Sequence, residues 1–159
     1  MKQTFNPRWL FFFSLTLGLG CADKSPFRVD PPVNAQGISA ALVSQNCDLE
    51  QDLEQQSSFV QDTLLTLQIT NQSLSAATFD SEKVRLAWSK QTSGPDLRHQ
   101  IGTIKAGDHT RVQLHFTLKG PDAACNNQTT LTLNDAISLD GKPVVLAPIK
   151  FQLTAMADP

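Results

Sequence analysis

The chain has 159 residues, of which 40% are hydrophobic and 18% charged, and its formal net charge is −2. The first 21 residues contain two of the thirteen basic side chains and none of the fifteen acidic ones, so the remaining 138 residues have a net charge of −4. This balance argues against a nucleic-acid partner, because such proteins need a basic face. The length is sufficient for one domain with a hydrophobic core.

The N-terminal residues have the pattern of an export signal. Lys2 and Arg8 precede or border an apolar run over residues 9–19, and the first acidic residue is Asp23. A basic start, a short apolar core and small residues at the exit are the parts of a signal peptide, whereas a membrane-spanning helix needs about 20 apolar residues. We therefore expect residues 1–21 to direct export and not to remain as a membrane span.

The signal ends in Gly18-Leu19-Gly20-Cys21, which resembles the lipobox of bacterial lipoproteins. That resemblance implies cleavage before Cys21, a diacylglycerol on its thiol, and anchoring in the bacterial cell envelope by acyl chains. The next residue is Ala22 and not Asp, which in Gram-negative members of the family favours the outer membrane. The same four residues also fit the small-x-small exit site of an ordinary secreted protein.

The number of cysteines helps to choose between these alternatives. The chain has three, Cys21, Cys47 and Cys125. We expect a disulfide between Cys47 and Cys125, because disulfides persist outside the cytoplasm, and a structural role for it, because no Cys-x-x-Cys motif occurs. The chain-entropy estimate for this bridge is about 4.5 kcal/mol at most. Lipidation then accounts for the cysteine that is left over.

Residues 22–36 are expected to form a flexible tether between the lipid and the folded domain. They include Pro26, Pro31 and Pro32 among polar residues, and proline restricts φ and removes a hydrogen-bond donor. At about 3 Å per residue, the tether would reach roughly 45 Å from the membrane. The folded domain is then residues 37–155.

The folded domain is expected to consist of short strands. Apolar and polar residues alternate in segments that are bounded by turn signals, and no helical period persists. The clearest strands are residues 59–70, where Leu65, Leu67 and Ile69 share one face, and residues 111–119, where His115 lies on the outward face. The other expected strands are residues 38–47, 83–90, 101–104, 130–133, 136–139, 144–146 and 149–153.

An acidic repeat, DLEQDLEQ, follows the first of these strands at residues 48–55. Carboxylates on alternate residues invite comparison with a calcium-binding EF-hand. However, Leu53 stands where that loop needs Gly, and Phe59 where it needs a bidentate Glu. We therefore expect a solvated acidic turn or one helical turn, with Leu49 and Leu53 on the same side.

Three segments resemble a class of bacterial immunoglobulin-like envelope domains. They are LTLQITN at residues 65–71, AGD at residues 106–108 leading into VQLHF at residues 112–116, and LDGKP at residues 139–143. The resemblance covers residues 60–153 and implies an all-β, immunoglobulin-like β-sandwich of seven to nine antiparallel strands. The chain has no Tyr, so it lacks the tyrosine corner of antibody domains. Such sandwiches have many unrelated functions, and the fold alone identifies none of them.

The sequence contains no Gly-x-Ser-x-Gly, phosphate-binding glycine loop, dinucleotide fingerprint or His-Glu-x-x-His. We expect a non-catalytic protein without a cofactor, which binds or supports another envelope protein. Sandwich domains usually bind through loops, here residues 91–100 and 120–127. The candidate binding residues are Ser93, Asp96, Arg98, His99, Asp122 and Asn126. The alternative is that these two loops only connect strands.

Two other functions stay open. One is a metal site, for which the candidate ligands are His99, Asp108, His109 and His115, although a zinc site needs three or four ligands that converge. The other is a small hydrolase whose catalytic residues assemble from distant positions. It would require a histidine within hydrogen-bond reach of a serine or a carboxylate.

Overall fold

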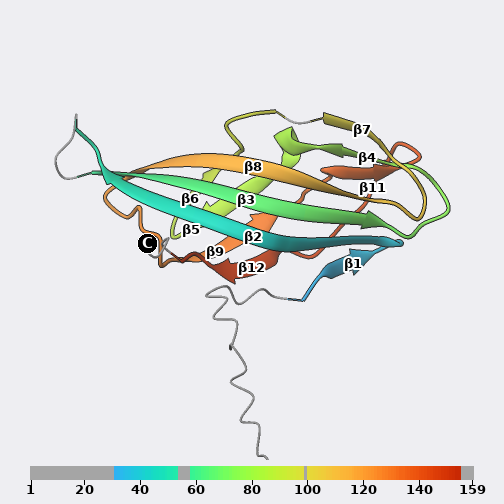
Figure 1. Ribbon diagram of the computed structural model, residues 1–159, viewed down its shortest axis with the longest axis horizontal. Helices are drawn as coiled ribbons and strands as arrows, with labels where there is room; N and C mark the ends of the chain where they lie inside the picture. The colour runs from blue at the N-terminus through green and yellow to red at the C-terminus, as the bar shows by residue number, and fades with distance from the viewer. Residues whose placement is uncertain (1–30, 54–57, 99, 155–159) are drawn as a thin grey trace, which may run out of the picture.

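The computed structural model describes residues 31–53, 58–98 and 100–154 (Figure 1). The expected signal peptide with Cys21, most of the expected tether and His99 lie outside the described residues. In the described part the chain forms antiparallel β-strands and one 3-10 turn, η1 (Ser81–Lys83). The all-β class expected from the alternation is therefore confirmed. No helix in this part is long and apolar enough to cross a membrane.

The front layer of the fold contains the long strands of the molecule (Figure 1). Its strands are β1 (Val33–Ala35), β2 (Ile38–Gln51), β3 (Phe59–Asn71) and β8 (His109–Gly120), in the order β1-β2-β3-β8. β2 and β3 form a hairpin that is paired along its length, and β3 pairs with β8 from end to end. β1 lies within the range expected to be tether, so the sheet begins four residues before residue 37.

The second layer contains two sheets of short strands, in the orders β12-β9-β5-β6 and β11-β10-β4-β7. β4 leads through η1 into β5, while β9 and β10 run alongside them in the opposite direction. The two sheets are therefore two halves of one layer. The strands are β4 (Ala77–Asp80), β5 (Arg85–Trp88), β6 (Gln91–Ser93), β7 (Gln100–Ile104), β9 (Gln128–Thr132), β10 (Ile137–Leu139), β11 (Lys142–Pro143) and β12 (Ile149–Gln152).

The breaks between these halves have local causes. Asp80 caps η1 by accepting a hydrogen bond from the N–H of Glu82, and Asp135 has φ of 54° between β9 and β10. Pro143 and Pro148 lie between or at the ends of β11 and β12, and proline cannot donate to a ladder. The described residues form twelve strand segments. Counting β4–β5, β6–β7, β9–β10 and β11–β12 as one interrupted strand each leaves eight, which agrees with the seven to nine expected.

The order of the long strands is that of an immunoglobulin-type sandwich. We count each interrupted strand once and set β1 aside. β2, β3 and β8 are then the first, second and fifth strands, and they form the front layer. The third, fourth, sixth and seventh strands are β4–β5, β6–β7, β9–β10 and β11–β12, and they form the second layer. These correspond to the A-B-E strands and to the G-F-C-C′ strands of immunoglobulin-like domains, with β6 and β7 at the C′ position.

The alternation of β3 and β8 produces the core as expected. Leu65, Leu67 and Ile69 are fully buried, and the register places Leu65 opposite Leu114 and Leu67 opposite Val112. The second layer covers these side chains with its own buried apolar residues, which include Leu86, Trp88, Leu131, Phe151 and Leu153.

A β-bulge explains the irregular alternation of β2. The register with β3 shifts between Leu42 and Ser44, and Val43 is the additional residue. Before the bulge Ala40 and Leu42 face the core, whereas after it Cys47 does so. The inward face therefore changes from even to odd positions.

The expectation of an acidic turn or helical turn at residues 48–55 was wrong for its first half. Asp48, Leu49, Glu50 and Gln51 continue β2 and pair with β3 as far as Phe59. In a strand the two kinds of side chain separate to opposite faces. Asp48 and Glu50 thus lie on the outer face of the front layer, and Leu49 lies on the inner face with Cys47.

Candidate functional site

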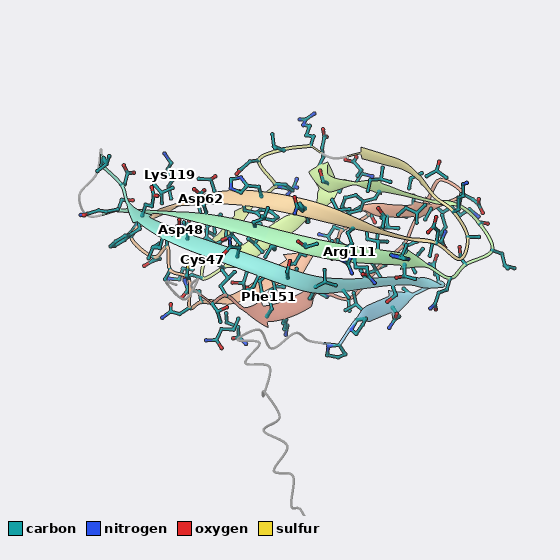
Figure 2. All side chains as sticks on the ribbon, viewed as in Figure 1. Cys47, Asp48, Asp62, Arg111, Lys119 and Phe151 are labelled. Atoms are coloured by element: carbon teal, nitrogen blue, oxygen red, sulfur yellow. A yellow bond between two sulfur atoms is a disulfide. The ribbon has the colours of Figure 1, made fainter. Side chains whose placement is uncertain are left out.

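The outer face of the front layer has a cluster of acidic residues near one end. Asp48 on β2 stands directly opposite Asp62 on β3, and Glu50 stands opposite Val60. Figure 2 shows Asp48, Asp62 and Lys119 near this end of the layer, with Arg111 farther along it. Like charges directly opposite each other destabilise a sheet, so this pair is present at a cost to stability.

His115 lies beside this cluster and faces two carboxylates. Its Nδ1 is 2.8 Å from Oδ2 of Asp96, and its Nε2 is 3.8 Å from Oδ1 of Asp62. The side chain is 41% exposed, as expected for an outward position on β8. A protonated imidazole can donate from both nitrogens. The charged form of His115 would therefore interact with both carboxylates.

Thr117 completes the cluster because its hydroxyl reaches both carboxylates. Oγ1 is 2.9 Å from Oδ1 of Asp62 and 2.8 Å from Oδ2 of Asp96. A hydroxyl has one proton and can donate to only one acceptor at a time. Thr117 therefore supplies one proton to two carboxylate oxygens, and a hydrogen bond to the second oxygen needs a proton from His115. We refer to Asp62, Asp96, His115 and Thr117 as the carboxylate–histidine cluster.

The segment between β6 and β7 is fixed to the side of β8 at this cluster. The N–H of Asp96 donates to the carbonyl of His115 at 2.8 Å, in addition to the side-chain contacts. Arg98 forms an ion pair with Glu82, and the hydroxyl of Ser93 donates to the carbonyl of Gly94. Asp96 and Arg98 thus attach this segment to β8 and to Glu82. Of the loop expected over residues 91–100, the first three residues form β6, while residues 96–98 are exposed.

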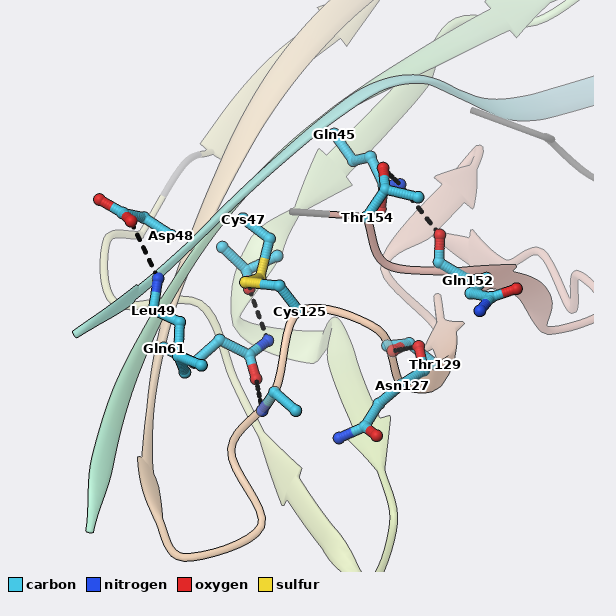
Figure 3. The surroundings of a disulfide bond; sticks show 12 residues. Gln45, Cys47, Asp48, Leu49, Gln61, Cys125, Asn127, Thr129, Gln152 and Thr154 are labelled. Carbon is cyan, nitrogen blue, oxygen red and sulfur yellow. Dashed lines mark hydrogen bonds between the residues drawn. A yellow bond between two sulfur atoms is a disulfide. The ribbon is translucent and has the colours of Figure 1, made fainter. Parts of the chain in front are cut away.

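The second candidate loop, residues 120–127, begins at the last residue of β8 and is fixed to the inner side of the front layer (Figure 3). Cys125 forms the expected disulfide with Cys47, with the Cα atoms 5.6 Å apart. Gln61 is fully buried; its Oε1 accepts from the N–H of Ala124, and its Nε2 donates to Thr63. The carbonyl of Asp122 accepts from the side chain of Asn127.

The two candidate loops therefore lie against opposite faces of the same layer. Asp96 contacts Thr117, whose hydroxyl also reaches the outward-facing Asp62. Ala124 instead contacts Gln61, which faces inward. Consecutive residues of a strand point to opposite faces. Asp96 and Arg98 on one side, and Asp122 and Asn126 on the other, do not make one continuous loop surface.

The three residues of the expected metal site that the structure describes, Asp108, His109 and His115, do not converge. Asp108 and His109 lie at the start of β8, and His115 lies six residues along the same strand face. At about 3.3 Å per residue, six residues separate the two histidines by roughly 20 Å. His99 lies outside the described residues. No group of three or more potential metal ligands occurs within the described part of the chain.

The criterion set for a hydrolase, a histidine within hydrogen-bond reach of a serine or a carboxylate, is met at His115, but the other contacts of His115 are not those of a catalytic triad. His115 is within hydrogen-bond reach of a carboxylate, but its other ring nitrogen also faces a carboxylate. In a catalytic triad that second nitrogen faces the nucleophile. The hydroxyl of Thr117 donates to one or the other carboxylate instead, so the cluster lacks the order of contacts of a triad.

Sequence reasoning identified His115 and Asp96 separately but missed Asp62 and Thr117. The cluster forms because the register of β3 and β8 pairs Asp62 with Thr117 and Leu64 with His115. Alternation indicates that these side chains face outward, but it does not give the register. No spacing in the sequence would have found the cluster.

Comparisons with known proteins add little to this geometry. No protein-family model matches the chain, and no curated protein matches it significantly. A structural genomics target solved by X-ray crystallography is 13% identical, with a TM-score of 0.49 over 75% of this chain and 87% of the other. A Bordetella pertussis protein provisionally named ApaA is 15% identical, with a TM-score of 0.46 over 80% and 98%. Both scores are below 0.5, so neither likeness bears on function.

Proposed function

We propose that this chain is a lipid-anchored protein of the bacterial cell envelope, held in the outer membrane by acyl chains on Cys21. The observation that carries the proposal is the disulfide between Cys47 and Cys125. It uses two of the three cysteines of the chain and leaves Cys21. Disulfides persist in oxidising compartments, which fits export, and a single remaining cysteine at a lipobox-like sequence fits lipidation.

We further propose that the sandwich has a non-catalytic role and binds or supports another envelope protein. The polar residues of the candidate loops are used to attach those loops to the sheets. The outward-facing carboxylate–histidine cluster does not have the order of contacts that acyl transfer requires. A binding role also agrees with the acidic end of the front layer, where charge is concentrated at a cost to stability.

Membrane fractionation of a Cys21→Ser variant tests the anchor. The unaltered protein should sediment with the outer membrane and resist extraction by salt, whereas Cys21→Ser should be recovered in the soluble envelope fraction. A Ser25→Ala variant is the matched control, since it alters a small side chain just after the proposed acylation site. The proposal is wrong if Cys21→Ser remains with the membrane to the same extent as the control.

A further inference from the structure

The outer edge of β2 is without a neighbouring strand over much of its length. β1 pairs only with Ile38, Ser39 and Ala40, while the other edge of β2 is paired with β3 as far as Gln51. The side chain of Gln45 donates to the carbonyl of Gln152 and to the hydroxyl of Thr154, so the second layer approaches the edge at that point. Among the described residues, no strand pairs with the outer edge of residues 46–50.

We propose that residues 46–50 accept an extended segment of a partner protein as an additional strand, with basic and apolar side chains in alternation. Five residues of strand extend about 17 Å, which is the length of an ordinary strand. Strand addition of this kind obtains affinity from the main chain and specificity from alternate side chains. The proposal rests on the envelope-binding role above and names the surface that performs it.

The two faces of this edge differ in chemistry. Asp48 and Glu50 lie on the outer face, with Asp62 directly beside Asp48. No described residue forms an ion pair with Asp48 or Glu50. On the inner face Leu49 is 40% exposed and Phe59 is 37% exposed. An added strand would thus place basic groups against carboxylates and apolar groups against Leu49 and Phe59.

The carboxylate of Asp48 also accepts a hydrogen bond from a backbone N–H that an added strand would use. In an antiparallel ladder alternate N–H groups point away from the paired strand. The N–H of Leu49 donates to Oδ1 of Asp48, its own neighbour, at 2.9 Å (Figure 3). A basic side chain on the incoming strand would attract the carboxylate and release this N–H. The acidic side chains then protect the edge from strands that lack basic residues.

The charge pattern argues against a second copy of this chain as the occupant. Two β2 edges paired with each other would bring the carboxylates of Asp48 and Glu50 from both copies onto one face. Like charges directly opposite each other are destabilising. Basic residues on the partner avoid this repulsion and relieve that between Asp48 and Asp62.

Binding of a labelled synthetic peptide with four Lys-Val repeats tests the proposal. The protein is purified in its mature form from the fraction that contains it. We expect saturable binding and shifts of the amide signals of residues 46–50 in nuclear magnetic resonance spectra. A peptide of the same composition, with four Lys followed by four Val, should bind at least tenfold more weakly, as should one with Glu in place of Lys. Equal binding of the block peptide, or signal changes confined to other strands, would overturn the proposal.

Two matched variants test whether the alternating peptide binds at residues 46–50. Asp48→Lys should weaken binding of the alternating peptide at least tenfold. Asp108→Lys should change it less than twofold, because Asp108 makes the same contact, accepting from the N–H of His109 at 2.8 Å, at the opposite end of the front layer. Equal weakening by both variants would indicate nonspecific attraction and reject the edge. Lipidation of Cys21 is measured separately. If Cys21 has lipid but the peptide does not bind, the proposed binding edge of β2 is wrong and the proposed membrane anchor stands.

Discussion

Asp48 and Asp62 face each other across the hairpin of β2 and β3, on the outer side of the front layer. The hydroxyl of Thr117 donates toward Asp62, and the carboxylate of Asp48 accepts from the N–H of Leu49. Neither contact places a positive charge between the two carboxylates. The hairpin therefore retains a repulsion that a single change of side chain can remove.

Asp48→Asn should raise the free energy of unfolding by about 0.5 kcal/mol, since cross-strand charge pairs contribute roughly 0.2–1 kcal/mol. The amide oxygen of Asn can still accept from the N–H of Leu49. The gain should be measured by denaturant unfolding at low ionic strength and should decrease with added salt. Asp108→Asn is the control and should leave stability unchanged. A loss of stability in Asp48→Asn would show that the two carboxylates do not repel.

The same variant should bind the alternating peptide more weakly, because the binding surface loses a charge. Gain of stability and loss of binding in one variant would indicate that the acidic pair is retained for recognition.

Asp96→Ala should loosen the attachment of residues 94–98 to β8. It removes the side-chain contacts of Asp96 with His115 and Thr117 and leaves the hydrogen bond from its N–H to the carbonyl of His115. We expect a loss of about 1 kcal/mol and faster hydrogen exchange at the amide of residue 96, measured on the folded protein. Asp122→Ala is the control, because Asp122 is also an exposed loop residue. Unchanged exchange in Asp96→Ala would show that the cluster does not hold the segment.

Gln61→Leu should destabilise the domain by about 1–3 kcal/mol. The amide of Gln61 is fully buried and is the acceptor for the N–H of Ala124, and a buried donor left without a partner costs energy of this size. The matched control is Gln113→Leu on the exposed face of β8, which should change stability by less than about 0.5 kcal/mol. Thermal or denaturant unfolding provides the measurement. Equal effects of the two substitutions would contradict the role given to Gln61.

Replacement of Cys47 and Cys125 together by Ala should lower the free energy of unfolding by about 2–5 kcal/mol. The bridge joins β2 to the loop before β9 across a long segment of chain, so its loss increases the freedom of the unfolded state. The double variant avoids leaving a free thiol, and reduction of the unaltered protein should produce the same shift in the denaturation midpoint. A loss below about 1 kcal/mol would show that the bridge is not needed for stability.

The strands could be predicted where one face is buried without interruption. Leu65, Leu67 and Ile69 alternate with polar residues throughout β3, and the structure buries them as expected. The bulge at Val43 could not be predicted, because an additional residue reverses the inward face without a signal of its own. The same reversal decides that Asp48 faces outward and Leu49 inward. The turn expected there came from the acidic repeat, which gave no sign that β2 continues to Gln51.

The cluster around His115 could not be predicted for a different reason. It depends on which residue of β3 lies opposite which residue of β8, and on the path of residues 94–98 over the edge of β8. Alternation restricts each side chain to a face but leaves the register to the packing of the whole sheet. The disulfide was predictable because only three cysteines are present and one belongs to the lipobox-like sequence.

Mass spectrometry of the intact mature protein tests the central claim most directly. We predict a chain that begins at Cys21, has the added mass of acyl groups and diacylglycerol on that residue, and gains two hydrogen atoms when it is reduced. A chain that begins elsewhere, or that begins at Cys21 without lipid, would contradict the anchor. An unchanged mass after complete reduction would contradict the disulfide between Cys47 and Cys125.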